Sequence, residues 1–454
     1  MPSGVSETLA AVPFSATGEG LAAALSTLAP ADAELRRTAL ARFEELPAPG
    51  MRPGRGWRYD YAKLPFDDLI WTSGRIAAPA LPPLPAAPPR APEEGVDRPA
   101  LATENAGGLY HLGATHVDAP VKRDPRITLV ALDASAERDF TATLSGVMHE
   151  IVDWRADKFA ALTTAFRNCG ALLYVHAGAQ IDEPIQLLFA NSAARDEAVF
   201  PHVVVVVGKG ARATVLERHV GEGDPFVCGI VEAHVGEGAE LDYAVVQQAG
   251  EAARVMFSRG ARCERDAQIR WHLAELGGAL VRTVLDARLD HPGARAEASA
   301  LFFNTGMQHV DLTSGVDHTV GPTTSDTVVR SAATDRGQGR YVGNIVIRAK
   351  AHGSDASLRD DALLLSKHAH IDSIPALEIA ANDVKAFHGA TVGSLDEDAL
   401  FYAGSRGIAR GEALRLITLG FFEPVIARFP GEALRDEVRS ALDRKIDDAT
   451  ELGA

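Results

Sequence analysis

The chain has few of the residues that build metal cages or disulfide frameworks. It contains three cysteines in 454 residues, Cys169, Cys228 and Cys263, which lie far apart and form no Cys-x-x-Cys pair. Neither a thiolate cage nor a disulfide framework is therefore predicted. Aromatic residues make up only 6%, whereas the 41 glycines suit tight turns and close packing of small side chains.

Long apolar runs and basic blocks are also missing. No stretch of about 18 apolar residues occurs, so we expect no membrane-spanning helix. No Lys or Arg precedes Arg36, so we expect no secretory signal. The formal net charge of −16 repels phosphate groups and argues against nucleic-acid or anionic-membrane binding. With 46% hydrophobic residues, the chain is predicted to be a folded cytoplasmic protein.

Three catalytic signatures are absent from the sequence. There is no GxxxxGKS/T phosphate-binding loop, and Gly208-Lys-Gly210 reads as a turn between strands. The GxSxG motif of serine hydrolases and the HExxH motif of zinc proteases are missing as well. We therefore expect this chain to have no ATPase, hydrolase or zinc protease activity of its own.

Changes of composition divide the chain into five segments. We expect, in order, an N-terminal helical module, a Pro/Ala-rich linker, a mixed α/β lead-in, a β-rich core and a C-terminal helical module, over residues 1–75, 76–98, 99–168, 169–392 and 393–454. Leucines at helical spacing, interrupted at Pro30, mark the first module. Within the lead-in, residues 157–168 read as an amphipathic helix.

The β-rich core consists of short apolar runs separated by glycine-containing turns. Many runs, such as Arg212–Arg218, alternate apolar with charged residues, as expected when one face of a sheet is solvated. The pair Gly-Ala recurs at expected strand starts, at Gly210, Gly238, Gly260 and Gly293. No helical pattern separates the strands, which argues against a doubly wound sheet. A sandwich, a barrel and a β-solenoid remain open.

The C-terminal segment is predicted to be helical. Ser394-Leu-Asp-Glu397 reads as a capping box that begins a helix ending near Ser405. Two further helices are expected over residues 411–428 and 432–448, separated by Pro430-Gly431.

Histidines and aspartates gather within the β-rich core. His309 and Asp311 alternate, so their side chains should share one face of a strand, and Asp317 and His318 follow. Such a face has metal-ligand geometry in principle. Side chains of this kind more often form hydrogen bonds within a sheet, because a ligand set usually needs a third partner.

A larger set of residues resembles one known family. The relevant strings are Gly343–Ile347, Leu363–Ser366, Pro375–Ile379, Asn382–Lys385, His388–Thr391, Leu400–Tyr402 and Ser405–Ile408. They resemble the shared core of the SufB/SufD family of iron–sulfur cluster assembly scaffold proteins. His388-Gly-Ala-Thr391 is similar to the SufD branch, whereas SufB has His-Glu-Ala-Thr there. Trp57-Arg-Tyr59 also resembles the SufD branch.

The resemblance implies a right-handed parallel β-helix, or solenoid, between helical end modules. It implies a non-enzymatic scaffold subunit that pairs with SufB through the β-helix and the C-terminal region. The C-terminal helices would dock on the separate ATPase SufC. A nascent iron–sulfur cluster would be a transient cargo shared with the partner subunit, and no recognisable flavin site is encoded.

His388 is the cluster residue that the resemblance implies, at the interface with SufB, and imidazole is a competent iron ligand. Two positions depart from the family pattern. Ala386 stands where SufD chains often have cysteine, and Ala403 stands where SufB carries an essential cysteine. Because alanine offers no sulfur ligand, we expect an auxiliary partner rather than a sole scaffold. Glu432 aligns with a SufB glutamate, but it reads first as a helix-start carboxylate.

Two alternatives remain. The chain could be a self-pairing relative that acts as a homodimeric scaffold, although Ala386 and Ala403 count against it. It could also be a β-solenoid enzyme acting on polysaccharide. Such an enzyme needs clustered acids, for which Asp311 and Asp317 are the only near candidates.

Overall fold

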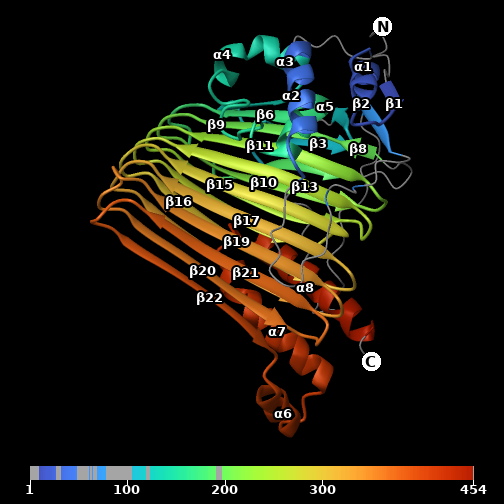
Figure 1. Cartoon of the computed structure of the whole chain (residues 1–454), viewed down its shortest axis with the longest axis vertical. Helices are drawn as coiled ribbons and strands as arrows, with labels where there is room; N and C mark the ends of the chain where they lie inside the picture. The colour runs from blue at the N-terminus through green and yellow to red at the C-terminus, as the bar shows by residue number, and fades with distance from the viewer. Residues whose placement is uncertain are drawn as a thin grey trace.

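The computed structural model describes residues 10–26, 32–48, 61, 64, 69–77, 105–118, 123–190 and 197–452. These ranges contain 22 strands and eight helices. The strands form a β-solenoid of about eight turns with helices at both ends (Figure 1). The predicted solenoid is therefore confirmed over a sandwich or a barrel. Most of the expected linker, and Trp57-Arg-Tyr59, lie outside the described residues.

Two parallel sheets face each other across the solenoid. The first sheet stacks β6 (Cys169–Val175), β9 (Pro201–Val207), β11 (Phe226–Val235), β13 (Arg254–Cys263), β15 (Leu280–Leu289), β17 (His309–His318), β19 (Gln338–Ile347) and β21 (His370–Ile379). The second sheet stacks β7 (Ile185–Ala190), β10 (Arg212–Gly221), β12 (Glu240–Ala249), β14 (Gln268–Glu275), β16 (Arg295–Asn304), β18 (Thr324–Ala333), β20 (Asp355–Leu364) and β22 (Lys385–Ser394). From β10 onward, each coil contributes one strand to each sheet.

Residues at the same register position form rows that run from coil to coil. One inward row of the first sheet contains Val227, Val255, Val281 and Val310, all buried. Inward rows of this kind fill the space between the sheets with Val, Leu, Ile and Ala side chains. Each coil therefore buries its apolar face only against its neighbours, as solenoids do.

Three of the four glycines that were expected at strand starts lie at corners of the coils. Gly210, Gly238 and Gly293 have φ values of 65°, 64° and 80°, a left-handed region that favours glycine. Gly260, expected at a strand start, instead lies inside β13. A Cβ atom there would lie 3.0 Å from side-chain carbons of Ile151 and Val152, so the missing side chain lets that segment pack closely on the sheet.

The N-terminal region adds short elements over the first coils. The helical prediction is confirmed by α1 (Gly18–Ser26) and α2 (Ala33–Glu45), whereas the expected break at Pro30 falls outside the described residues. The other elements are β1 (Ala10–Pro13), β2 (Ile70–Ala77), β3 (Gly107–Leu112), β4 (Thr115–Asp118), β5 (Ile127–Ala131), α3 (Ala134–Asp139), α4 (Thr141–Leu144), α5 (Lys158–Phe166) and β8 (Glu197–Val199). The expected amphipathic helix is α5, which begins after the capping residue Asp157. The prediction that this helix is amphipathic is wrong, because residues 159–166 are all buried beneath α2 and against β11.

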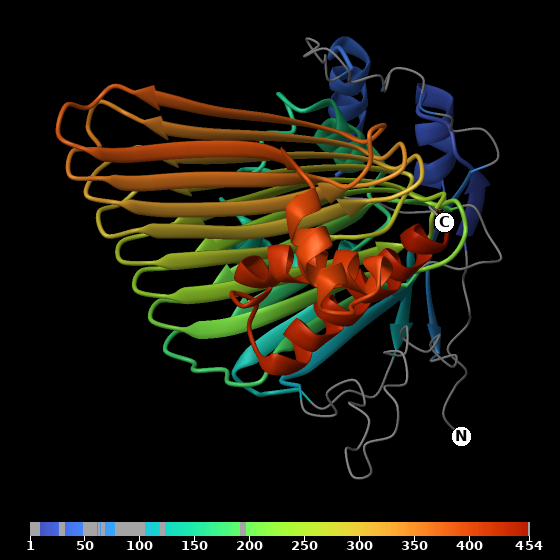
Figure 2. The same cartoon turned by 90° about the horizontal axis from the view of Figure 1, so that it is seen from below.

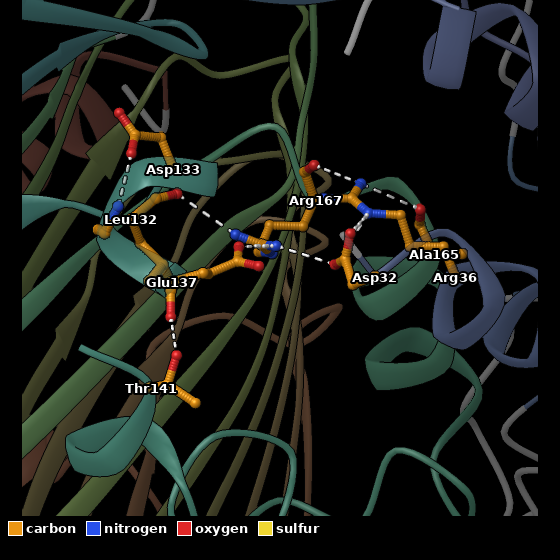
Figure 3. Close-up of polar contacts among 9 residues, drawn as sticks. Asp32, Arg36, Leu132, Asp133, Glu137, Thr141, Ala165 and Arg167 are labelled. Atoms are coloured by element: carbon orange, nitrogen blue, oxygen red, sulfur yellow. Dashed lines mark hydrogen bonds and ion pairs between the residues drawn. The ribbon is translucent and has the colours of Figure 1, made fainter. Parts of the chain in front are cut away.

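An ion-pair cluster attaches α2 to the start of the solenoid (Figure 3). The guanidinium of Arg167, just after α5, binds Asp32 at 3.1 Å and also the carboxylate of Glu137. Arg36 binds Asp32 at 3.0 Å and donates a 2.8 Å hydrogen bond to the backbone carbonyl of Arg167. Both arginine side chains are buried, so this cluster fixes the N-terminal helices in place.

The C-terminal helices fold back over the outer face of the second sheet (Figure 2). They are α6 (Glu397–Ser405), α7 (Arg410–Ile426) and α8 (Glu432–Leu452), close to the expected ranges. Apolar residues of α7 and α8 pack on outward residues of β12 and β16. The expectation of a solvated face at Arg212–Arg218 is therefore wrong for its later residues, since Arg218 is buried and pairs with Glu437 at 2.8 Å.

The expected capping box is also wrong in detail. Ser394 ends β22, and Asp396 is the residue that caps α6, where its carboxylate accepts a 2.9 Å hydrogen bond from the backbone N–H of Asp398. The carboxylate of Glu397 instead forms an ion pair with Arg410, at 3.1 Å. Across the described ranges, no helix is both long and apolar enough to cross a membrane.

Candidate functional site

The C-terminal end of the solenoid is an open coil, a name used here for β21 and β22. Strand β21 pairs with β19 and β22 pairs with β20, and no other strand in the described ranges pairs with either. Each strand is ten residues long and leaves one edge uncovered, as Figure 1 shows at its lower border. The coil exposes large apolar side chains, namely Ile374, Ile379, Phe387 and Val392. It is therefore both an unpaired sheet edge and an apolar surface.

His388 lies on this open coil, as the fourth residue of β22. It ends an inward row whose earlier members are Tyr243, Trp271, Ala298, Thr327 and Leu358. Those residues are buried, whereas His388 is exposed because no further coil covers it. The imidazole is thus available to a chain that stacks on the open coil.

Ala386 and Ala403, where the sequence resemblance leads us to expect cysteine, offer no ligand atom. Ala386 is two residues before His388 in the same strand, and Ala403 lies in α6. The cysteines cannot substitute for them, because all three are buried within other parts of the fold. Burial raises the pKa of Cys228 and of Cys263 to about 12, so these thiols stay protonated at neutral pH.

Glu432 occupies the first turn of α8, as a helix-start carboxylate should. It is bound by Arg439 at 3.0 Å and by Arg435 at 3.1 Å. The hydrogen bond from Arg439, followed by the attraction of both guanidinium groups, lowers its pKa. These contacts engage Glu432 within its own helix.

The predicted histidine–aspartate pairs on β17 do not form a metal site. His309 and Asp311 share the outer face of the strand as expected, whereas Asp317 faces outward and His318 inward. His318 is buried and its Nδ1 lies 2.7 Å from the hydroxyl oxygen of Thr323. Within the described part of the chain, no group of three or more His, Cys, Asp or Glu side chains is arranged to hold a metal ion.

The acids that a polysaccharide-cleaving enzyme would need are also too far apart. Asp311 and Asp317 lie six residues apart on one strand, which corresponds to about 20 Å. Paired catalytic carboxylates lie roughly 5–10 Å apart. Each acid is instead bound by an arginine, Asp311 by Arg340 at 3.3 Å and Asp317 by Arg348 at 2.9 Å.

The solenoid interior contains a charged network that was not predicted. Glu217, the sixth residue of β10, is fully buried and accepts hydrogen bonds from Arg259 at 2.8 and 3.1 Å. His219 lies 2.6 Å from the same carboxylate, and the Tyr243 hydroxyl also donates to it. Burial alone would raise the pKa of Glu217, but Arg259 and His219 hold it well below its usual value. Glu217 is therefore a buried carboxylate whose negative charge is balanced by the guanidinium of Arg259.

A second interior carboxylate lies at the other end of the same row. The row runs through Glu217, Val245, Leu273, Ala300, Val329, Asp360 and Ala390. Asp360 is fully buried, and neither of its carboxylate oxygens has a hydrogen-bond partner of normal geometry among the described residues. Burial raises its pKa to about 7, although the nearby Ser373 hydroxyl acts in the opposite direction. Asp360 is therefore an uncompensated acid one coil below the open end.

Comparison with known proteins places these features in a family context. Residues 189–421 match the family described as "SUF system FeS cluster assembly, SufBD core domain". The iron–sulfur cluster assembly protein SufD of Bacillus subtilis is 28% identical over 293 residues, which cover 64% of this chain and 67% of that protein. SufB of the same organism is 28% identical over 280 residues, 61% of this chain and 60% of SufB. An iron–sulfur cluster assembly SufBD family protein of Mycobacterium leprae is 27% identical over 265 residues, 58% of this chain but only 30% of that protein.

Proposed function

The chain belongs to the SufBD family of iron–sulfur cluster assembly proteins, and on that premise we propose that it is a SufD-like, non-enzymatic scaffold subunit of the cytoplasmic SUF system. His388-Gly-Ala-Thr391 on the open coil supports the SufD assignment. The absence of sulfur ligands at Ala386 and Ala403 supports an auxiliary role, since clusters need thiolate ligands.

The open coil supports pairing with a SufB-type subunit. An uncovered strand edge presents unpaired N–H and C=O groups, which a strand of another chain can bind. Exposed apolar residues such as Phe387, 58% exposed, would be covered in the same contact. A second copy of this chain could stack in the same way, so a homodimer in isolation is the alternative.

The C-terminal helices support docking of the ATPase SufC. Helix α6 projects beyond the solenoid in Figure 1. It exposes Phe401 and Tyr402 at 79% and 60%, and α7 exposes Leu416 at 50%. Exposed aromatic side chains on a projecting helix are typical anchors of a protein interface.

The cargo at the pairing surface would be a nascent iron–sulfur cluster held in part by His388. A neutral imidazole nitrogen can bind iron. The sulfur ligands would come from the SufB-type subunit, because no cysteine of this chain lies on the open coil. This subunit would thus provide the surface on which the cluster lies and one nitrogen ligand. The SufB-type partner would provide the thiolate ligands.

One experiment tests the complex and the cluster role separately. The chain is co-purified with SufB and SufC and reconstituted anaerobically as wild type, His388→Ala and the control His291→Ala, an exposed histidine far from the open coil. We expect less iron and sulfide per complex only in His388→Ala. A chain that forms no complex with SufC would refute the proposed function, whereas unchanged cluster content in His388→Ala would refute only the role of His388.

A further inference from the structure

The interior of the solenoid shows how this fold compensates a buried acid. Glu217 is the sixth residue of β10 in the second sheet. Its partner Arg259 is the sixth residue of β13, in the first sheet and three strands further along the chain. The guanidinium crosses the interior and binds both carboxylate oxygens, at 2.8 and 3.1 Å. Glu217 is therefore matched by a cation of the facing sheet that lies three strands further along the chain.

Asp360 occupies the position in its strand that Glu217 occupies in β10, but it has no arginine equivalent to Arg259 among the described residues. It is also the sixth residue of its strand, β20, and belongs to the same row. The row of Arg259 continues through Leu285, Ser314 and Gly343 to Pro375 of β21. The position equivalent to Arg259 would lie one strand beyond Pro375. After β22 the chain turns into α6, so none of the described strands occupies that position.

A chain that stacks on the open coil changes the surroundings of Asp360. Only one layer, with Ala390 in the second sheet and Ser373 in the first, separates this acid from the open end. Ala390 is exposed and Ser373 only partly buried, so stacking would exclude solvent from that layer. A carboxylate that loses water without gaining a partner opposes association, whereas one that gains a cation favours it. Asp360 therefore favours a stacking chain that places a positively charged side chain beside it and disfavours one that does not.

A second copy of this chain does not bring the required arginine or lysine. The inward residues of its open coil are Ile371, Ser373, Pro375, Leu377 and Ile379 of β21 and Ala386, His388, Ala390, Val392 and Ser394 of β22. None of them is a lysine or an arginine. The charge requirement thus favours a different chain as the occupant.

We propose that Asp360 is a specificity determinant of the pairing surface: the partner strand that stacks on β21 carries an inward-facing arginine or lysine, which enters the solenoid and pairs with Asp360. The inference rests on the pairing proposed above and deepens it. It assigns the open coil to a heterologous SufB-type strand with a cationic inward side chain, and it disfavours self-pairing.

The test compares the affinities of three forms of the full chain for the SufB-type subunit of the same source. They are wild type, Asp360→Asn and the control Asp372→Asn, an acid on the outer face of β21 that binds His370 at 3.0 Å. We expect Asp360→Asn to raise the dissociation constant at least about 30-fold, the effect of losing one member of a buried charge pair. The control should stay within about twofold. Asp360→Asn should remain as heat-stable alone as wild type or more so, which separates lost pairing from lost folding.

A second arm locates the partner's cation. Each inward lysine and arginine of the SufB strands is changed to glutamine and measured against wild type and Asp360→Asn. One such change should weaken binding to wild type but have no further effect on Asp360→Asn. Unaltered affinity of Asp360→Asn would overturn the proposal, as would a wild-type homodimer that is lost in both Asp360→Asn and His388→Ala. If wild type does not bind SufB at all, the proposed function itself fails and the inference with it.

Discussion

Replacing Asp360 by asparagine should stabilise the isolated chain, and the gain should grow as the pH rises from about 4 to about 7. Burial raises the pKa of Asp360 from 3.8 to about 7 in the folded chain. Between these values the unfolded chain has released the proton while the folded chain still holds it. The unfolded state then binds fewer protons, so the free energy of unfolding of the wild type falls as the pH rises.

The size of this stability difference follows from the change in the pKa of Asp360 between the unfolded and the folded chain. About three pKa units correspond to about 4 kcal/mol above pH 7, of which about 1.5 kcal/mol is already present at pH 5. Asparagine keeps the shape of the side chain and does not titrate, so the advantage of Asp360→Asn over wild type should increase by about 2–3 kcal/mol between pH 5 and pH 8. Urea unfolding followed by circular dichroism measures this difference, with Asp372→Asn as control. Equal pH dependence in wild type and Asp360→Asn would refute the reasoning, because it would mean that Asp360 is not held in an uncompensated site.

Three further outcomes are expected. Arg259→Met should lower the free energy of unfolding by about 3–5 kcal/mol, because it leaves Glu217 buried without its cation; adding Glu217→Gln should restore most of the loss, as urea titrations of both variants would show. Arg36→Met should increase amide hydrogen exchange in α2 at least about tenfold and leave β13 unchanged, since the Asp32 cluster fixes only the N-terminal helices; uniform exchange changes would contradict this. Native Cys228 should react with a thiol reagent at least about 100-fold more slowly than in urea, because the thiol is buried and protonated; fast labelling of the folded chain would contradict its burial.

The predictable part of the fold is the part with apolar strands. Runs such as Val203–Val207 show their strand character directly, and Pro430-Gly431 marks the break between the last two helices. The late strands are harder, because β20 has acids on both faces and β22 has glycines at two positions. Their pattern resembles neither a buried nor a half-exposed strand. The family resemblance, rather than periodicity, identified that region.

The interior acids carried a local signal that was available in the sequence. Glu217 is followed by Arg218, and Asp360 by Asp361, and neighbouring residues in a strand point to opposite faces. One of each pair therefore had to point inward. Which partner it meets depends on the length of each coil, and the glycine spacing was a poor guide because Gly260 lies within a strand. The exposure of His388 was equally hidden, since it depends on where the solenoid stops.

The two ends of the solenoid are built differently, and this difference bears on function. At the N-terminal end, β5 pairs antiparallel with β6 and α5 is buried among the first coils. At the C-terminal end, α7 and α8 cover the outer face of the second sheet but leave the edges of β21 and β22 uncovered among the described residues. Proteins usually protect edge strands with charges, prolines or bulges, and these two ten-residue strands carry Asp372, Pro375, Glu378 and Lys385 as such residues. An edge this long, with exposed apolar side chains and an uncompensated acid beneath it, is typical of a surface that is completed by another chain. The pairing proposed here therefore predicts that the edge itself, and not the helix-covered face, is the contact.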